Sequence, residues 1–406
     1  MQIPKRPDNR VLYFIYTILY TTGFMFCSGS ILQTFMLSVG MSDAEVSTYS
    51  AVTQFVQVLA IFAMTFLADK FKKTLKIYAS SVLTVTLIAV ALVFCVFVRS
   101  DLVAVKAIIF ATSIAVYLMI GVRSAVDYKI IYEIFDMNGI GKLMGVVIAV
   151  SGLVSFGVST AYSYAIKQFD YYDVMTVFFI LSVFMIAFAA IAGFSYKKIN
   201  DVPESEKARG LDFSIFKNKT ARALSMPSFC RGFANGVILL ITVAGFSSEI
   251  LTTQSSTYIT IITQAATFCG NIFFAFICRR VSNKTSLLVS SIVMAVAMPL
   301  TVLRGDLTEF LIFYAVAYFA VMIISISNPL LVCELVPYEQ IGSFTCIRMM
   351  LFTFGSVVAS VLFKPLADLV GYAWLFVIAG VLQIVCGVVH YVVARRVGTL
   401  PTATEK

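Results

Sequence analysis

Residues 174–196 read VMTVFFILSVFMIAFAAIAGFSY, an apolar run of 23 residues without a charged side chain. A helix needs about 20 such residues to cross the hydrocarbon core of a bilayer. Eleven further runs of similar character occur along the chain. The predicted spans lie near 11–38, 44–68, 75–98, 102–127, 143–166, 174–196, 220–246, 256–278, 285–303, 308–331, 345–364 and 371–394.

The composition is that of a chain surrounded by lipid. Of the 406 residues, 60% are hydrophobic and 13% are charged, and the mean hydropathy is +0.94. Soluble domains are about half apolar and about a quarter charged, so a soluble chain of this composition could not cover its surface. Membrane β-strands would alternate in polarity, whereas these runs are continuous. The predicted fold class is therefore an all-α membrane protein with about twelve transmembrane helices.

The basic residues indicate how the chain is oriented. Of the 30 Lys and Arg residues, 22 lie in the two termini and in the even-numbered connections. The opposite side carries only Arg99, Lys106, Lys167, Arg304 and Lys364. Cytoplasmic loops are rich in Lys and Arg, so both termini are predicted to be cytoplasmic in a multi-pass protein of the cell membrane. The net charge of +9 is thus an orientation signal and requires no nucleic-acid partner.

An internal repeat divides the chain into two halves. Glu133 precedes Gly141 by eight residues, and Glu334 precedes Gly342 by the same spacing, 201 positions further on. The polar connection 196–219 lies between the halves. We expect two pseudo-symmetric six-helix bundles, residues 1–195 and 220–406, joined by a cytoplasmic linker over 196–219, as in secondary transporters with repeated halves.

No motif for catalysis or metal binding appears. The eight cysteines stand singly in apolar runs, CxxC does not occur, and His390 is the one histidine, which argues against a disulfide framework or a zinc site. A phosphate-binding glycine loop, a nucleophile motif and GxxxxGK[ST] are also absent. We therefore expect no enzyme, no catalytic residue, no metal, no cofactor and no ATP-driven transport, and no soluble signalling module indicates a receptor.

The stretch after the second span resembles the signature of the major facilitator superfamily, Gly-x-x-x-Asp-Arg-x-Gly-Arg-Arg. Asp69, Lys70 and Lys73 match that signature in type, whereas Thr65 and Lys72 replace glycines.

The stretch Glu334-x-x-Pro337-x-x-x-x-Gly342 is similar to the family pattern at the end of helix ten, especially in sugar porters, and Asp136 replaces the proline in the first half. The resemblance covers essentially the whole chain. It implies a secondary transporter that works by alternating access, with rocking of the two bundles.

The resemblance also implies a charge network that latches the cytoplasmic side in the outward-facing state. Solvated helix ends are the alternative explanation for the same residues. The gating candidates are Asp69, Lys70, Lys73, Glu133, Glu334, Arg279 and Arg280.

Arg231 is the leading candidate for a substrate-binding residue. Ionisable residues within spans are costly and usually face a cavity or a partner. Arg231 lies near the middle of the seventh span, and Ser228, Asn235 and Thr242 fall on the same helical face. An arginine tied to polar groups purely for packing is the alternative.

The other candidates are less distinctive. Arg123 lies four residues before Asp127, so a local ion pair and a contact with substrate are equally good explanations. Interhelical hydrogen bonds would equally explain the amides. The further substrate-binding candidates are Asn328, Gln264, Gln57 and Gln33. No acid stands clearly at mid-membrane, and Asp127 is the nearest candidate for a coupling site.

The predicted function is uptake of a small polar solute, a sugar or an organic acid, across the cytoplasmic membrane. Drug efflux by the same fold is the alternative. Exporters of this family often carry Gly-x-x-x-Gly-Pro-x-x-Gly-Gly in helix five, whereas the stretch from Gly145 to Gly157 has no proline. The expected partners are the solute, the bilayer and a coupling proton or sodium ion, and the protein is expected to be a monomer.

Overall fold

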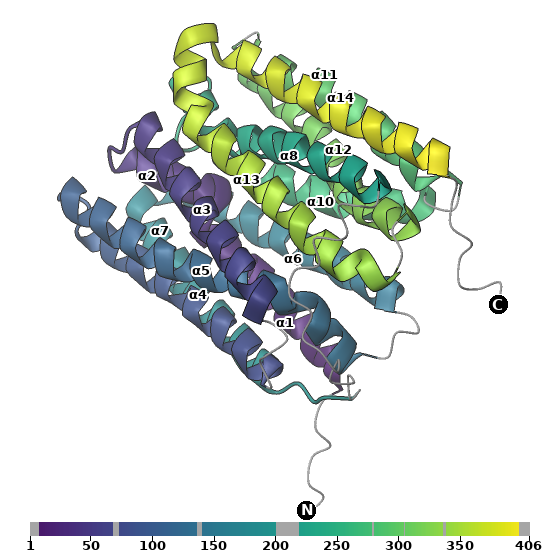
Figure 1. Ribbon diagram of the computed structural model, residues 1–406. Helices are drawn as coiled ribbons and strands as arrows, with labels where there is room; N and C mark the ends of the chain where they lie inside the picture. Colours follow the sequence, from purple (N-terminus) through teal and green to yellow (C-terminus); the bar gives the residue numbers. More distant parts are fainter. Residues whose placement is uncertain are drawn as a thin grey trace, which may run out of the picture. The chain divides into compact units, whose positions relative to one another are not determined.

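The computed structural model describes residues 8–67, 73–135, 140–199, 219–277, 280–303, 305–335 and 338–397, without some of the side chains beside the gaps. In this part of the chain every regular element is a helix (Figure 1). Continuous apolar runs favour helices in a membrane, because a helix satisfies its own backbone hydrogen bonds where no water is present.

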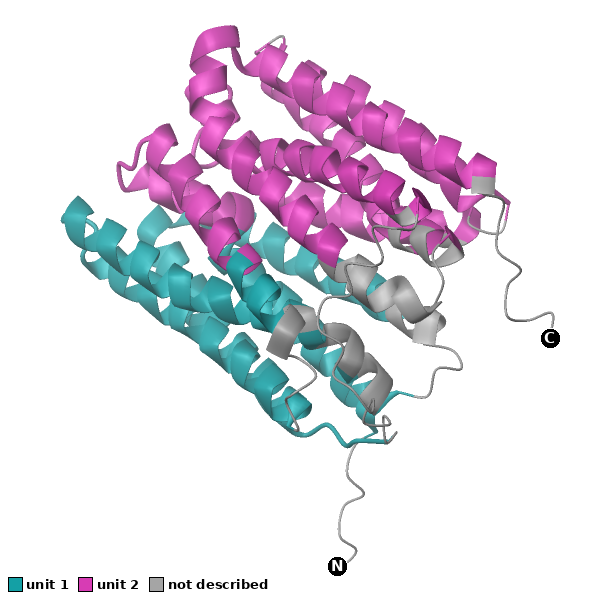
Figure 2. Cartoon of the chain, viewed as in Figure 1, with its two compact units in different colours: residues 1–28, 59–209 teal, residues 29–58, 210–406 magenta. Residues whose placement is uncertain are grey.

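The helices form two compact units, and each is described by itself (Figure 2). Unit 1 comprises residues 1–28 and 59–209. In unit 1, α4 packs against α5 and α7, and α1 packs against α6 and α7. Its helices are α1 (Asn9–Phe24), the 3-10 helix η1 (Met25–Cys27), the end of α3 (Asp43–Leu67), α4 (Thr74–Phe97), α5 (Leu102–Ile134), α6 (Ile140–Gln168) and α7 (Tyr171–Phe194).

Unit 2 comprises residues 29–58 and 210–406. In unit 2, α8 packs against α13 and α14, and α11 packs against α12 and α14. Its helices are α2 (Gly29–Ser38), the start of α3, α8 (Lys219–Leu239), α9 (Ile241–Ser247), α10 (Thr257–Ile277), α11 (Asn283–Leu303), α12 (Leu307–Leu335), α13 (Tyr338–Val370) and α14 (Tyr372–Val397).

Large apolar side chains cover the outside of the helices. Along one face of α7, Val177, Phe184, Phe188 and Ile191 are each more than half exposed. Among the described residues, ten helices are long and apolar enough to cross a membrane, and α8 with α9 forms an eleventh span that bends by 45°. Helix α10, which corresponds to the remaining predicted span, is not among these eleven. These helices match the predicted spans in order and position.

The helices extend further than the apolar runs. Helix α5 continues to Ile134, and α13 runs from Tyr338 to Val370, so Lys364 lies inside α13 and not at its end. Apolar runs mark only the part of a helix in hydrocarbon, whereas its polar turns continue into the interface. Residues 200–218, most of the predicted linker, lie outside the described residues. Residues 29–58 cluster with the second half of the sequence, through hydrogen bonds such as Ser30 Oγ to Thr260 Oγ1 at 2.7 Å.

Candidate functional site

Arg231 lies in the membrane-crossing part of α8 and is partly buried. Its Cζ atom is 5.4 Å from the centre of the Phe352 ring on α13, within the range of a cation–π contact. In the described part of the chain no hydrogen bond and no ion pair reaches its guanidinium. The structure thus places a permanent positive charge inside a membrane helix with one aromatic neighbour.

Helices α8 and α13 touch along their backbones beside this arginine. A Cβ atom added to Gly232 would collide with the carbonyl of Phe352, and one added to Gly355 would collide with the backbone of α8. Ser356 Oγ donates a hydrogen bond to the Gly232 carbonyl at 2.7 Å. Small residues that allow such close approach are typical of helix pairs in membranes. This contact fixes the positions of Arg231 and Phe352 relative to each other.

Two further helices bring polar groups to the same region. Arg348 on α13 donates from Nη2 to Asn328 Oδ1 on α12 at 2.7 Å. On α14, His390 Nδ1 donates to the Cys386 carbonyl at 2.8 Å, and both side chains are fully buried. The two guanidinium groups lie within electrostatic range of this pair. We call this set the arginine cluster: Arg231, Asn328, Arg348, Cys386 and His390.

Helix α8 does not continue straight into α9. The two helices meet at Leu240 with a bend of 45°. Gln33 Nε2 donates to the Leu239 carbonyl at 2.8 Å, so this predicted substrate residue satisfies a backbone group at the bend. Thr242 lies beyond the bend on α9, and the polar face predicted for a straight helix is therefore wrong beyond Asn235.

The other predicted amides have no assigned partner. Asn235 on α8, Gln57 on α3 and Gln264 on α10 are partly buried, and the described residues form no hydrogen bond with their side chains. Such groups remain available to water or to a ligand.

Arg123 belongs to unit 1. Its Cζ atom lies 4.1 Å from the centre of the Tyr20 ring, a close cation–π contact. Asp127 lies in the same helix, α5, but its side chain is outside the described residues, so the predicted local ion pair stays a prediction.

Most of the predicted cytoplasmic latch lies outside the described residues. This holds for Asp69, Lys70 and Arg279, and for the side chains of Glu133 and Glu334.

Two latch candidates are described. Lys73 is the exposed residue before α4, and the exposed Arg280 follows α10, where its backbone N–H donates to the Ile277 carbonyl at 2.8 Å.

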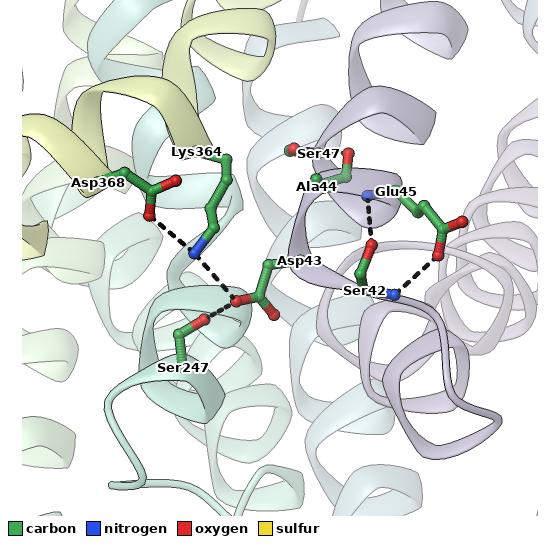
Figure 3. A network of polar contacts seen from close by, with 8 residues as sticks. All are labelled: Ser42, Asp43, Ala44, Glu45, Ser47, Ser247, Lys364 and Asp368. Carbon is green, nitrogen blue, oxygen red and sulfur yellow. Dashed lines mark hydrogen bonds and ion pairs between the residues drawn. The ribbon is translucent and has the colours of Figure 1, made fainter.

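A polar network that the sequence did not reveal joins α3, α9 and α13 in unit 2 (Figure 3). Lys364 Nζ lies 2.9 Å from Asp368 Oδ1 and 3.9 Å from Asp43 Oδ2. The Ser247 hydroxyl donates to the same Asp43 oxygen. We call Asp43, Ser247, Lys364 and Asp368 the Asp43 network. It ties residues from both halves of the sequence together at one end of unit 2.

One part of this network had a signal in the sequence. Ser42 and Glu45 form a capping box, in which the Ser42 N–H donates to Glu45 Oε2 at 2.9 Å and the Glu45 N–H donates to Ser42 Oγ at 3.3 Å. The S-x-x-E pattern could have placed Asp43 in the first turn of α3. Its partners could not have been found, because they lie more than 200 positions away in the sequence.

Comparison with known proteins finds no matching family by sequence and no matching curated protein. Solved structures do match over nearly their whole length. A D-xylose–proton symporter gives a TM-score of 0.71 at 14% identity, with 94% of this chain and 96% of that chain covered. The inward-open xylose transporter XylE from E. coli gives 0.69 at 13% identity, with 97% of each chain covered. The nucleoside transporter NupG gives 0.66 at 15% identity, with 95% and 99% covered.

The chain therefore has the fold of these solved transporters, and the predicted fold class, an all-α membrane protein, is confirmed. The three similar structures are all transporters.

Proposed function

We propose that this protein is a secondary transporter that takes up a small polar solute, a sugar or an organic acid, across the cytoplasmic membrane by alternating access. Arg231 carries the proposal. A guanidinium within a membrane helix costs at least a few kcal/mol on insertion scales, and it stays charged. With no acceptor among the described residues, water or a ligand must compensate for this cost. The fold shared with xylose and nucleoside transporters supports the same function.

Uptake by purified protein in proteoliposomes tests this proposal. We expect Arg231→Ala to abolish uptake while the protein remains folded and inserted. Arg99→Ala is the matched control, because Arg99 also lies over an aromatic ring, Tyr172, at 4.6 Å. Normal uptake by a stable Arg231→Ala protein would contradict the site. An unstable variant would favour a structural role for the arginine.

Alternating access requires a barrier on each side of the solute. The Asp43 network is a candidate for one barrier, at the end of unit 2 where α13 ends and α14 begins. Arg395 and Arg396 lie at the other end of α14. In the orientation predicted from the basic residues, the network is on the outer side. The seven charged residues of the family resemblance would form the inner latch.

A coupling ion remains part of the proposal. One similar structure is a proton symporter, which supports a proton. Asp127 is the nearest candidate to bind it. Collapse of a pH gradient should lower uptake if a proton is coupled, and replacement of sodium by potassium should lower it if sodium is coupled. Asp127→Asn should remove either dependence.

Drug efflux is the competing function. The absence of a proline between Gly145 and Gly157 on α6 favours uptake. Right-side-out and inverted vesicles loaded with the same solute distinguish the two directions.

A further inference from the structure

We infer, given the proposed transport function, that the solute carries an oxyanion, a carboxylate or a phosphate, and that Arg231 binds this group. The arginine cluster presents hydrogen-bond donors and positive charge, and the described residues around it supply no negative charge in return.

Arg231 differs from the other two arginines within the spans. Arg123 lies closer to its aromatic ring, and Arg348 is hydrogen-bonded to Asn328. Contact with the Phe352 ring at 5.4 Å occupies none of the five N–H groups of Arg231. A guanidinium holds these donors in a planar fork that matches two oxygens of one carboxylate or phosphate.

The neighbours of Arg231 leave its charge uncompensated. Cys386 and His390 do not compensate it, because a thiol and an imidazole are mainly neutral at pH 7. The His390 ring donates through Nδ1 to the Cys386 carbonyl. The second guanidinium, from Arg348, lies near the same pair. The described carboxylates of unit 2 all lie near helix ends, away from the arginine cluster: Asp43, Glu45, Glu249, Asp306, Glu309 and Asp368.

The hydrogen-bonding character of the cluster selects for an acceptor. Asn328 uses its oxygen for Arg348, and its Nδ2 donor is buried without a partner among the described atoms. A neutral sugar offers hydroxyl groups that need acceptors as well as donors, whereas an ionised carboxylate offers acceptors only. Hydrogen bonds between a guanidinium and an ionised carboxylate are charge-assisted and about twice as strong as hydrogen bonds between neutral groups.

The backbone contact between α8 and α13 holds Arg231 beside Phe352. Gly232 follows Arg231 directly, and a Cβ atom added to it would collide with the Phe352 carbonyl. A rigid fork cannot be replaced well by a lysine, which has the charge without the geometry. We therefore expect Arg231→Lys to keep the preference for anions and to bind them more weakly.

The experiment uses two solute series, each with a shared carbon skeleton and with a neutral, a carboxylate and a phosphate member: glucose, glucuronate and glucose 6-phosphate, and glycerol, glycerate and glycerol 3-phosphate. Uptake into proteoliposomes and ligand-dependent thermal shifts are measured for the wild type, Arg231→Gln, Arg231→Lys and the control Arg99→Gln. We expect anionic members of a series to be taken up. Arg231→Gln should lower their uptake at least tenfold, and Arg231→Lys should raise KM at least fivefold. Arg99→Gln should behave as the wild type.

The outcomes separate this inference from the transport function itself. If the wild type and Arg231→Gln take up a neutral member equally well and do not take up the anions, the inference of an oxyanion on the solute is wrong, whereas the proposed transport function is supported. If the folded wild type moves no member in either direction, both ideas are contradicted. If Arg231→Gln fails to insert, the Arg231→Lys protein decides: an unchanged KM for the anions overturns a paired contact with the guanidinium.

Discussion

Gly232 determines how closely α8 and α13 can approach. An alanine there would press its methyl group into the Phe352 carbonyl, and backbone cannot move aside as a side chain can. We expect Gly232→Ala to lower stability by about 1–3 kcal/mol, the usual cost of overpacking. Thermal unfolding of the detergent-solubilised protein measures this loss.

Gly157 on α6 is the matched control, because an added Cβ meets no atom within 4 Å. In a helix interior alanine is more stable than glycine by roughly 0.5–1 kcal/mol, so Gly157→Ala should be neutral or slightly stabilising. Equal unfolding temperatures for the two variants would show that the α8–α13 contact is looser than the structure indicates.

Arg231 could be found from sequence because a charge inside an apolar run is rare and expensive. Its surroundings could not. Phe352 and Cys386 look like ordinary core residues in a sequence, and His390 gave no metal-binding pattern. Their proximity to Arg231 depends on how α8, α13 and α14 pack, which an isolated apolar run does not encode.

The bend between α8 and α9 depends on a residue from a distant helix. Gln33 donates to the Leu239 carbonyl, which lies where the two helices meet. We expect Gln33→Ala to lower stability by about 0.5–1.5 kcal/mol, the usual net contribution of one hydrogen bond, because this hydrogen bond is part-buried. Gln57→Ala removes an amide that bonds to no described residue and should change the unfolding temperature little. A larger loss for Gln57→Ala than for Gln33→Ala would contradict this role.

The Asp43 network is the proposed barrier on the outer side, which we call the outer gate. It can be tested with matched variants, because Lys364 has two carboxylate neighbours. Asp43→Asn weakens the contact between α3 and α13, whereas Asp368→Asn removes only the pair within α13. Exposed ion pairs contribute up to about 1 kcal/mol, so Asp43→Asn should raise the population open on that side roughly two- to fivefold. Asp368→Asn should not.

Accessibility of a cysteine placed behind the gate measures this population. Ser50 lies two turns beyond Asp43 on α3 and bonds with Ser360 Oγ on α13 at 3.2 Å. In a background without native cysteines, Ser50→Cys should react faster with an impermeant thiol reagent when Asp43→Asn is present. The same rate with both carboxylate variants would refute the gate.

The spans themselves were predictable, since apolar length decides them. The bend after Leu239 was not, because the sequence stays apolar across it. The length of α13 was also missed, because the predicted span ended at Lys364, whereas Lys364 and Asp368 are paired one turn apart within the helix.

The predicted orientation of the whole chain can be tested with two conservative changes. Ser100 lies in the exposed turn between α4 and α5, and Ser282 lies in the exposed turn before α11. We expect Ser100→Cys to react with an impermeant reagent from outside the cell, and Ser282→Cys to react only after the membrane is opened. The reverse pattern would overturn the orientation and would place the Asp43 network on the cytoplasmic side.

The two-bundle division followed from the repeat and the central polar connection. Compact packing groups the chain differently, with residues 29–58 joined to the second half. The repeat records how the sequence is built, whereas hydrogen bonds such as Gln33 to Leu239 and Gln54 to Ser360 decide which segments pack together. Pairings of that kind depend on single polar atoms and are invisible in hydropathy.

The arrangement of Lys364 between two aspartates has a kinetic consequence. When Asp43 moves away, Asp368 remains at 2.9 Å, so the ammonium group of Lys364 keeps an ion-pair partner. When this contact opens, water replaces the long ion pair between Lys364 and Asp43 and the hydroxyl contact between Ser247 and Asp43. Contacts at such an exposed boundary are screened within about a nanometre at physiological ionic strength. Added salt should therefore weaken the pair between Lys364 and Asp43, and opening on that side should become easier as the salinity of the outer medium rises.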